Sequence, residues 1–443
     1  MELKSLLPPF DIPDVPFHEY CFRKFRKYGN TVAMINNDTK EQFTYLDLIE
    51  KAEFIARSLI SLGVEKSEVV LQVMDNAPEC VYIALGVSLA GAVMQFMSPR
   101  LKAWEMQPPV EESETRFIFC DPLGLSEVTK LMNSLERDYR IICTGPRDFA
   151  KGHPILDDLR VVGNNKYAVF PTIKPEQDVV FLPYSSGIHG LRKGVLTTHK
   201  VMLGKTLAAQ NKNYEVYGKG EKYTLTMLPF HKQMGFEARI ITLLCGVIAS
   251  VHLTPELMGM MIFEAKNHDY DLSCLKCVIS GSEALTEDLY NEFQQTFPSV
   301  KHVVQTYWMT EVGLICRGQR NDSYTSSCGK LVANLELKVI DIWTGKKLGP
   351  NLKGDIGYYD DDQNIYLVDK MKEMIKVFGY QVIPAEIESL LLTHRAVEEA
   401  AVVAINNDIS GERPVAFVVL KRGHKVTGDE IKQFVNTDAH DNK

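Results

Sequence analysis

One apolar run limits the folds that this chain can adopt. Residues Cys80–Met97, "CVYIALGVSLAGAVMQFM", are nearly long enough to cross a bilayer as a helix. Gly86, Ser88 and Gly91 interrupt the run, and Gly91 stands where a helix would end before the strand-like "AVMQFM". We therefore expect a helix, a turn and a buried strand here, and no transmembrane segment.

The segments around this run alternate between helical and strand-like patterns. Thr44 can cap a helix whose apolar residues recur at helical spacing from Leu48 to Leu62, and Gly63 is a natural stop. A helix over 76–91 then separates the strand-like "EVVLQVM" and "AVMQFM", and further strands are expected at "RFIFC", "YRIICTG" and "DVVFLPY". This alternation predicts an α/β fold with a parallel sheet covered on both faces.

Length and composition narrow the functional classes. A chain of 443 residues suggests two to four domains or subdomains, and 45% hydrophobic with 24% charged residues is typical of a globular protein. The 49 basic and 57 acidic residues give a net charge of −8, which offers no reason to expect a nucleic-acid partner. Nine cysteines without disulfide spacing, and no opening signal peptide, favour a reducing compartment. The single "CLKC" at 274–277 fits a core segment better than a zinc knuckle, because it lacks a second pair.

Past Gly354 the sequence consists of short, charged, turn-rich segments. The acidic turn Asp360–Asn364 predicts a hairpin, and Pro384 stands in the first turn of a predicted helix, "PAEIESLLLTH". The segments "VEEAAVVAI" and "RPVAFVVLKRG" predict strands, and "TGDEIKQFV" predicts a helix. Together these elements indicate a small α+β domain at the carboxyl end.

The stretch Tyr184–Val195, "YSSGIHGLRKGV", is a candidate phosphate-binding loop. Small residues let backbone N–H groups approach an anion closely, and Lys193 adds a point charge. A solvated turn between two strands would also explain this composition. The loop follows a predicted strand, which is the expected context for anion binding in an α/β sheet. It is not a Walker A loop, because Lys193 follows Arg192 and precedes Gly194.

Five segments occur in an order that resembles one enzyme family. They are this loop, "VISGSEAL", "QTYWMTE", "GDIGYYDDD" and "DKMKEMIKVFGYQVIPAEIES". In this order they resemble the adenylate-forming enzymes, specifically the branch of acyl-CoA synthetases, 4-coumarate ligases and beetle luciferases, and the likeness covers nearly the whole chain. The resemblance implies a large amino-terminal α/β domain over 1–368, with parallel-type sheets, covering helices and a sheet-rich appendage. It also implies a small mobile carboxyl-terminal α+β domain over 369–443.

The resemblance implies a reaction and a set of site residues. Such enzymes activate a carboxylic acid with ATP, forming an acyl-adenylate, and then usually pass the acyl group to coenzyme A. Phosphate contacts are implied for Ser185, Ser186, Gly187, Lys193 and Thr310, and Mg²⁺ binding for Glu311. Adenosine contacts are implied for Gly281, Ser282, Glu283, Ala284, Tyr307, Asp355 and Lys370. Acyl-substrate contacts are implied for His231, Lys232 and Trp308, a hinge for Lys372, catalysis of the later step for Lys376 and a position on the coenzyme A side for Gly379.

Several positions depart from the family pattern. Ile188 removes a hydroxyl donor from the loop, and His189 and Arg192 replace the usual threonine and proline. Glu283 puts a carboxylate in the implied adenine pocket where the family usually has alanine, and Trp308 replaces a glycine and could fill the acyl pocket. Further departures are Lys370 where an arginine usually reaches the ribose, and Lys232 at the position of the substrate-facing histidine.

The resemblance also implies segments that this sequence lacks. One lies between "VHLTPEL" and "DLSCLKC", and one between "LGPN" and "KGDIGYY". No residue up to Lys443 can be assigned to the family's carboxyl-terminal lysine, so adenylation is expected to be slow. Two functions stay open: a weak acyl-CoA synthetase for a fatty or aromatic acid, or a paralogue or isoform that binds nucleotide or a partner without turnover. A cytosolic location is expected, with the peroxisome as the alternative, since "HDNK" is no peroxisomal signal.

Overall fold

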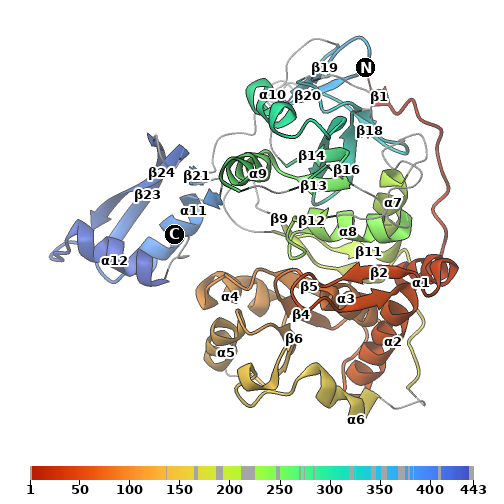
Figure 1. Ribbon diagram of the computed structural model, residues 1–443. Helices are drawn as coiled ribbons and strands as arrows, with labels where there is room; N and C mark the ends of the chain where they lie inside the picture. Colours follow the sequence, from red (N-terminus) through yellow and green to blue (C-terminus); the bar gives the residue numbers. More distant parts are fainter. Residues whose placement is uncertain are drawn as a thin grey trace.

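Two six-stranded sheets and a separate four-stranded sheet organise the computed structural model of this protein (Figure 1). The structure describes residues 2–135, 137–163, 168–185, 193–210, 225–245, 250–268, 271–273, 275–282, 285–318, 324, 326–340, 346–350, 357–367, 375–377, 380–382, 384–407 and 411–438. In Figure 1 the small lobe at the carboxyl end projects to one side of a larger body that holds both six-stranded sheets.

The first sheet confirms the predicted parallel α/β arrangement. Its central strands β8, β5, β4, β6 and β7 are parallel, and only β11 at one edge is antiparallel. In spatial order the strands are β11 (Thr197–Thr198), β8 (Val179–Phe181), β5 (Val93–Met97), β4 (Val69–Val73), β6 (Phe117–Cys120) and β7 (Arg140–Cys143).

Helices cover both faces of this sheet. Val70 of β4 belongs to the core beneath α1 (Phe17–Tyr28), α2 (Tyr45–Ser61) and α3 (Pro78–Leu89). Leu71, its neighbour along the strand, faces the other core beneath α4 (Ala103–Glu112) and α5 (Leu125–Ser134). Because successive strand residues alternate between faces, a strand covered on both sides is apolar throughout, as "EVVLQVM" nearly is.

The apolar run at 80–97 folds into a helix and a strand as expected. Ten of the twelve residues of α3 are buried, and Gly91, with φ of +76°, turns the chain into β5. A Cβ on Gly86 would lie 2.7 Å from the Cβ of Ile55, so this glycine lets α2 and α3 approach closely. In the part of the chain that the structure describes, no helix is long and apolar enough to cross a membrane.

The second sheet combines parallel and antiparallel strands. Strands β12 to β15 are parallel, β16 is antiparallel to β15, and β17 is in turn antiparallel to β16. The order is β12 (Leu225–Thr226), β13 (Ser250–Leu253), β14 (Cys277–Ser280), β15 (His302–Met309), β16 (Gly313–Arg317) and β17 (Lys330–Leu331). A core that includes Met258, Ile262 and Phe293 lies between this sheet and the helices α9 (Pro255–Asn267) and α10 (Glu287–Thr296).

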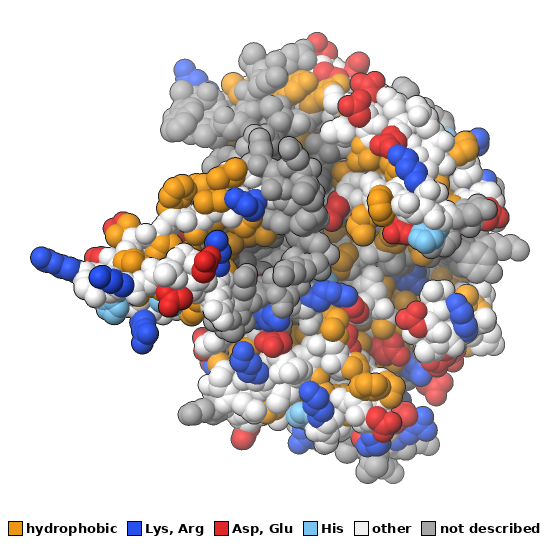
Figure 2. Space-filling model, turned by 60° about the vertical axis from the view of Figure 1, so that its left-hand side comes forward, with side chains coloured by type: hydrophobic (Ala, Val, Ile, Leu, Met, Phe, Trp, Pro, Cys, Tyr) orange, Lys and Arg blue, Asp and Glu red, His pale blue; other side chains and the backbone are white. Residues whose placement is uncertain are grey.

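The carboxyl-terminal lobe has the predicted α+β composition. Its strands are ordered β22 (Tyr380–Val382), β21 (Ile375–Val377), β24 (Gly411–Leu420) and β23 (Val397–Asn407), and its helices are α11 (Pro384–Thr393) and α12 (Gly428–Asp438). One face of the β23–β24 hairpin packs on the helices through Val402 and Ile431. On the hairpin, Val403, Ile405, Phe417 and Val419 are exposed, and hydrophobic side chains are visible on this lobe in Figure 2.

Short elements complete the fold. Four two-stranded ladders pair β1 (Leu3–Lys4) with β18 (Glu336–Leu337), β2 (Val32–Ile35) with β3 (Gln42–Thr44), β9 (Tyr184–Ser185) with β10 (Lys193–Gly194), and β19 (Gly357–Tyr359) with β20 (Ile365–Leu367). The β19–β20 ladder is the hairpin predicted around Asp360. The remaining helices are α6 (Arg160–Gly163), α7 (His199–Ala209) and α8 (Gln233–Cys245). Thr44 caps α2 as the sequence predicts, and the structure adds Asp47 as its partner in a capping box.

Candidate functional site

The two ends of the predicted phosphate loop face each other. Ser185 and Lys193 are directly paired partners in the antiparallel β9–β10 ladder, which brings the chain back on itself after residues 186–192. Lys193 is exposed, while Ser185 is half-buried. Tyr184 fixes the base of this ladder, because its hydroxyl donates to the Glu112 carboxylate at 3.0 Å. Lys193 therefore lies beside Ser185, and a phosphate-binding role for the two residues stays a prediction.

The predicted adenine segment begins where β14 ends. Gly281 follows the last residue of that strand, and a Cβ at this position would lie 2.7 Å from the Thr306 hydroxyl oxygen on β15. Ser282 has a φ of +74°, a left-handed conformation that non-glycine residues adopt infrequently. Its hydroxyl lies 3.1 Å from the Met234 sulfur on α8. The chain thus turns away from the carboxyl end of a parallel strand, where α/β sheets commonly bind ligands.

The predicted acyl-substrate residues precede α8. His231 is half-buried and Lys232 is exposed, and the Lys232 N–H donates to the Pro229 carbonyl at 3.1 Å. Asn76 holds this segment by two hydrogen bonds. Its amide nitrogen donates to the Leu228 carbonyl at 2.8 Å, and its Oδ1 accepts the Phe230 N–H at 2.7 Å. A distant side chain therefore sets the backbone path into the predicted acyl site.

Strand β15 presents two aromatic rings to opposite cores. Tyr307 packs against a cluster that includes Ile315 and Cys316, while Trp308 packs against Ala208, Ile241 and their neighbours between α7 and α8. Burial raises the pKa of the Tyr307 phenol, so the hydroxyl stays protonated near neutral pH. Trp308 therefore occupies space beside α7 and α8, and its placement in an acyl pocket stays a prediction.

The turn after β15 carries the predicted metal ligand. Thr310, Glu311 and Val312 connect Met309 to Gly313, which pair across the start of the β15–β16 hairpin. Thr310 is half-buried and the Glu311 carboxylate is exposed. A carboxylate and a hydroxyl are oxygen donors, which Mg²⁺ prefers, and Mg²⁺ commonly takes only one or two carboxylates alongside substrate phosphates. The donor set fits Mg²⁺ on a nucleotide, and no group of three or more potential ligands occurs among the described residues.

A buried ion pair lies directly behind this turn. Lys205 of α7 donates from its Nζ to the Thr310 carbonyl at 2.7 Å, and the same Nζ lies 3.8 Å from Oε1 of Glu237 on α8. Both side chains are 3% exposed. Burial lowers the pKa of Lys205 and raises that of Glu237, while the attraction between the two opposes both shifts. The pair is compensated further by Gln233, whose amide donates to the Glu237 carboxylate.

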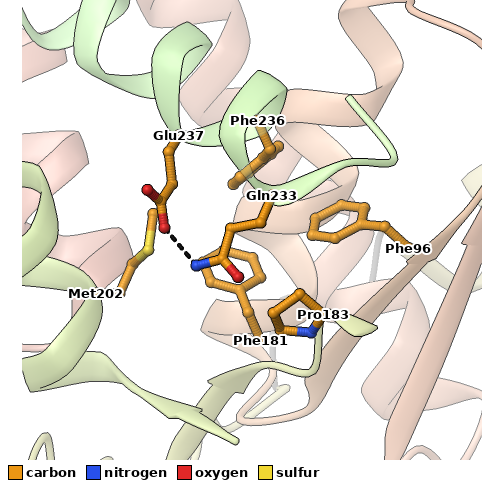
Figure 3. Close-up of a pocket in the computed structure, with 7 residues that line it drawn as sticks. All are labelled: Phe96, Phe181, Pro183, Met202, Gln233, Phe236 and Glu237. Carbon is orange, nitrogen blue, oxygen red and sulfur yellow. Dashed lines mark hydrogen bonds between the residues drawn. The ribbon is translucent and has the colours of Figure 1, made fainter. Parts of the chain in front are cut away.

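One pocket joins the phosphate-loop strand to α8. It is small and is lined by Phe96, Phe181, Pro183, Met202, Gln233, Phe236 and Glu237 (Figure 3). Pro183 lies two residues before Ser185, and Gln233 follows Lys232. The pocket and the contacts above therefore bring the loop base, the start of α8, the adenine segment and the Thr310 turn into one region.

Other predicted site residues cannot be placed. Ser186, Gly187, Ile188, His189, Arg192, Glu283, Ala284, Asp355, Lys370, Lys372 and Gly379 lie outside the described residues, as does Cys274 of the "CLKC" segment. Lys376 lies on β21, of which only the backbone is described at this position. Their roles stay predictions.

Sequence reasoning missed three residues that shape this region. Asn76 was expected to begin a helix, but α3 begins at Pro78 and the Asn76 side chain bonds a distant loop. Lys205 and Glu237 received no role. A usable signal existed for both, since each is a charged residue within a predominantly apolar helical segment, and such charges are rarely buried without a partner.

Comparisons with known proteins assign the family. The AMP-binding enzyme family matches residues 21–251 and 247–358, and the AMP-binding enzyme C-terminal domain matches residues 386–441. A 4-coumarate–CoA ligase from Vanilla planifolia is 31% identical over 505 residues, covering 98% of this chain and 89% of the relative. A 4-coumarate–CoA ligase 2 from Nicotiana tabacum is 30% identical, covering 98% of this chain and 90% of the relative.

These alignments also show internal differences in length. Since 98% of 443 residues is about 434, about 71 of the 505 positions aligned with the Vanilla planifolia enzyme have no residue in this chain. The family match divides at residues 247–251, beside the first of the two predicted internal deletions. The relatives therefore contain internal segments that this chain lacks.

Solved structures share the fold. The luciferase-like enzyme from the nonluminescent mealworm Zophobas morio superposes with a TM-score of 0.74 at 21% identity, covering 85% of this chain and 100% of that one. A long-chain-fatty-acid–CoA ligase from Archaeoglobus fulgidus superposes with a TM-score of 0.77 at 19% identity, covering 97% and 96% of the two chains. Together with the family match over most of its length, these likenesses show that the chain belongs to the AMP-binding, adenylate-forming enzyme family.

Proposed function

We propose that this chain is an ATP-dependent ligase that joins a carboxylic acid to coenzyme A through an acyl-adenylate. One observation carries the proposal: the segments predicted to hold adenine, acyl substrate and metal contact one another through described residues. Ser282 reaches Met234 at the start of α8. Lys205 then links the Glu237 carboxylate of the same helix to the Thr310 turn. Family membership and the 4-coumarate–CoA ligase relatives support the same reaction.

The proposal gives the described residues distinct tasks. Lys193 neutralises phosphate charge at the mouth of its loop, and the Thr310 hydroxyl donates to the α phosphate. Tyr307 stacks on the adenine ring above Gly281 and Ser282. Mg²⁺, held by Glu311 and phosphate oxygens, would supply charge neutralisation as pyrophosphate leaves. Roles for Ser185, Ser186, Gly187, Glu283, Ala284, Asp355 and Lys370 in nucleotide binding belong to the same proposal.

The acid is proposed to be a fatty or aromatic carboxylic acid. It would enter beside His231, Lys232 and Trp308, where an exposed ammonium group can attract the carboxylate. The substrate class rests on the family's range, since the structural neighbours include a long-chain-fatty-acid–CoA ligase and an anthranilate–CoA ligase.

Domain organisation and location complete the proposal. A large domain over 1–368 binds ATP and acid, and a small domain over 369–443 rotates about Lys372 between the two half-reactions. Lys376 and Gly379 would then face the thioester-forming site with coenzyme A. We propose a cytosolic location, with the peroxisome as the family-based alternative, and no nucleic-acid partner.

Pyrophosphate exchange into ATP tests this function directly. Wild-type protein is incubated with Mg²⁺, ATP, labelled pyrophosphate and a panel of fatty and aromatic acids, and acyl-adenylate is detected by mass spectrometry. Glu311→Gln should lower the exchange rate by about a hundredfold, because removing one charge-stabilising group from such a site costs that much. Glu287→Gln, a substitution of an exposed carboxylate on α10, is the matched control and should leave the rate unchanged. Acid-independent exchange, or equal rates in both variants, would refute the proposal.

A second function has one observation in its favour. Trp308 fills space between α7 and α8 where the family pattern has a glycine, which favours a protein that binds nucleotide without turning over an acid. Calorimetry with AMP and ATP separates the two. Nucleotide binding at or below about millimolar Kd together with no acid-dependent exchange selects the second function.

A further inference from the structure

Lys205 occupies an unusual place for a lysine. Its side chain is nearly inaccessible to solvent, yet its ammonium group faces one carboxylate and one backbone carbonyl. Burying a charge is costly unless it is paired and hydrogen-bonded, so a lysine here requires both partners. Glu237 supplies the countercharge, and Gln233 in turn donates to Glu237 (Figure 3).

The surrounding backbone is shaped to admit this lysine. Gly313 begins β16 with a φ of +84°, and a Cβ there would lie 2.9 Å from the Lys205 Cγ and 3.1 Å from its Cβ. The lysine stem therefore packs against Gly313, where only glycine, which has no Cβ, leaves enough room. Beyond Gly313 the ammonium reaches the Thr310 carbonyl at 2.7 Å.

The contact falls on the turn that the proposed function assigns to ATP chemistry. Thr310 and Glu311 are adjacent in the chain. Burial lowers the pKa of Lys205, and the negative charge of the Glu311 carboxylate opposes this lowering. The lysine hydrogen bond is made to the Thr310 carbonyl and uses neither the Thr310 hydroxyl nor the Glu311 carboxylate. A fixed carbonyl restricts the peptide plane that joins these two residues.

We propose that Lys205 is a positioning residue for adenylation: its buried ammonium, held by Glu237, fixes the Thr310 carbonyl and so the direction in which Thr310 and Glu311 meet the metal–nucleotide complex. This inference rests on the proposed function. Lys205 touches no reacting atom and acts through the turn. Glu237 lines the pocket of Figure 3, and its carboxylate also lies 3.8 Å from the Lys205 ammonium, so the pair connects that pocket to the turn.

Three substitutions separate positioning from simple stabilisation. Lys205→Met keeps most of the apolar stem but removes the donor and leaves Glu237 without its countercharge. Lys205→Met combined with Glu237→Gln removes both charges, so the fold is relieved of a buried unpaired carboxylate. Glu237→Gln alone keeps the donor to Thr310. Lys200→Met on the same helix, where the lysine pairs with Glu176 at the surface, is the matched control.

Positioning predicts a specific pattern. In pyrophosphate exchange, Lys205→Met and the double variant should both lower kcat by at least about tenfold with the KM for the acid changed less than about threefold, because the lost group orients the reacting phosphate and does not bind acid. Thermal unfolding should show the double variant more stable than Lys205→Met. Glu237→Gln should retain more of the wild-type kcat than either lysine variant, and Lys200→Met should match wild type.

A second readout does not depend on turnover. Hydrogen exchange of the peptide that contains Met309–Gly313, measured in the nucleotide-free protein, should be faster in the double variant than in wild type and unchanged in Lys200→Met. A wild-type kcat in the folded double variant would overturn the inference, and so would an unchanged rate of hydrogen exchange in this peptide. A wild-type protein that gives no acid-dependent pyrophosphate exchange would instead overturn the proposed function. In that case, faster hydrogen exchange of the Met309–Gly313 peptide in the double variant would still show that Lys205 orders the turn.

Discussion

Asn76 binds the backbone on both sides of Pro229. Its side chain accepts the Phe230 N–H at 2.7 Å and donates to the Leu228 carbonyl at 2.8 Å, although the two segments lie more than 150 residues apart in the chain. The first sheet thereby holds the segment that leads into α8. The exit of β4 and the entry to the predicted acyl site are thus fixed to each other by one amide group.

Asn76→Ala should therefore weaken the fold measurably. Two partly buried backbone groups would lose their partner, and each loss costs about 1 kcal/mol or more, so the free energy of unfolding should fall by about 2 kcal/mol. Urea unfolding followed by circular dichroism measures this change. Asn267→Ala, which removes one exposed hydrogen bond to the Phe263 carbonyl, is the control and should cost well under half as much. Equal losses in both variants would contradict the prediction.

Gly313→Ala should be more damaging than its backbone angle alone explains. A positive φ penalises alanine at Gly63 and Gly313 alike, since their φ values are +88° and +84°. Only at Gly313 would the added Cβ also meet a neighbour, the Lys205 stem at 2.9 Å, whereas none of the described residues lies within 4 Å of a Cβ at Gly63. The free energy of unfolding should fall by about 1 kcal/mol in Gly63→Ala and by at least about 2 kcal/mol in Gly313→Ala. Similar losses would show that Lys205 moves aside freely.

Local patterns in the sequence predicted the elements but not the contacts between them. The capping box at Thr44, the glycine after α2 and the turn before β5 depend on neighbouring residues, so the sequence contained the whole signal. The Asn76–Phe230 and Lys205–Thr310 contacts join residues more than 100 positions apart. Such pairings depend on how the two large sheets pack together, which no local pattern encodes.

The candidate site shows the same contrast between residues that the sequence predicted and residues that only the structure revealed. Motif order alone predicted Tyr307, Thr310 and Glu311, and the structure places them along one strand and the turn that follows it. The residues that hold this turn from behind were not predicted, because a lysine or glutamate in a helix is ordinarily expected at the surface. Their place in predominantly apolar helical segments signals a buried charge, but only the structure shows which partners they hold.

Three buried histidines should make stability sensitive to mild acid. His18, His199 and His252 are 6%, 1% and 7% exposed, and burial lowers their pKa values to about 3, about 4 and about 3. The His199 Nδ1 accepts the Phe17 N–H at 3.1 Å, which requires the neutral ring. Asp178 attracts a proton to His199, whereas Lys66 and burial oppose it.

The direction of the pH effect follows from these shifts. In the unfolded chain all three imidazoles titrate near pH 6.5, so below that pH the unfolded state binds protons that the folded state does not. Stability is therefore full above about pH 6.5 and falls as the pH drops toward 4, by about 1.4 kcal/mol per pH unit for each histidine. Denaturant unfolding between pH 7 and pH 4.5 measures the slope. His199→Gln should reduce this slope by about 1.4 kcal/mol per pH unit, the contribution of one proton, and an unchanged slope in His199→Gln would contradict the assignment.

Trp308→Ala should change which acids the protein accepts, if the proposed ligase function holds. The indole packs against Ala208, Ala209, Ile241 and Leu314, in the position where the family pattern has a glycine. Removing it opens a volume beside α7 and α8 that a bulky acyl group can fill. Relative to wild type, the ratio of kcat/KM for a bulky aromatic acid to that for a short aliphatic acid should rise by at least about tenfold, since one to a few buried carbon groups discriminate by that much.

The stability of the same variant provides the internal check. Truncating a well-packed tryptophan should lower the free energy of unfolding by about 3 kcal/mol or more, and a bulky acid supplied with AMP should restore part of the lost thermal stability in Trp308→Ala but not in wild type. Ile241→Ala removes packing from the same cluster on α8 and is the matched control, because it loosens this core without truncating the residue at the implied acyl position. An equal rise in the acid ratio in both variants would mean that general loosening of the core, and not the Trp308 ring, sets the size of the acid that this protein accepts.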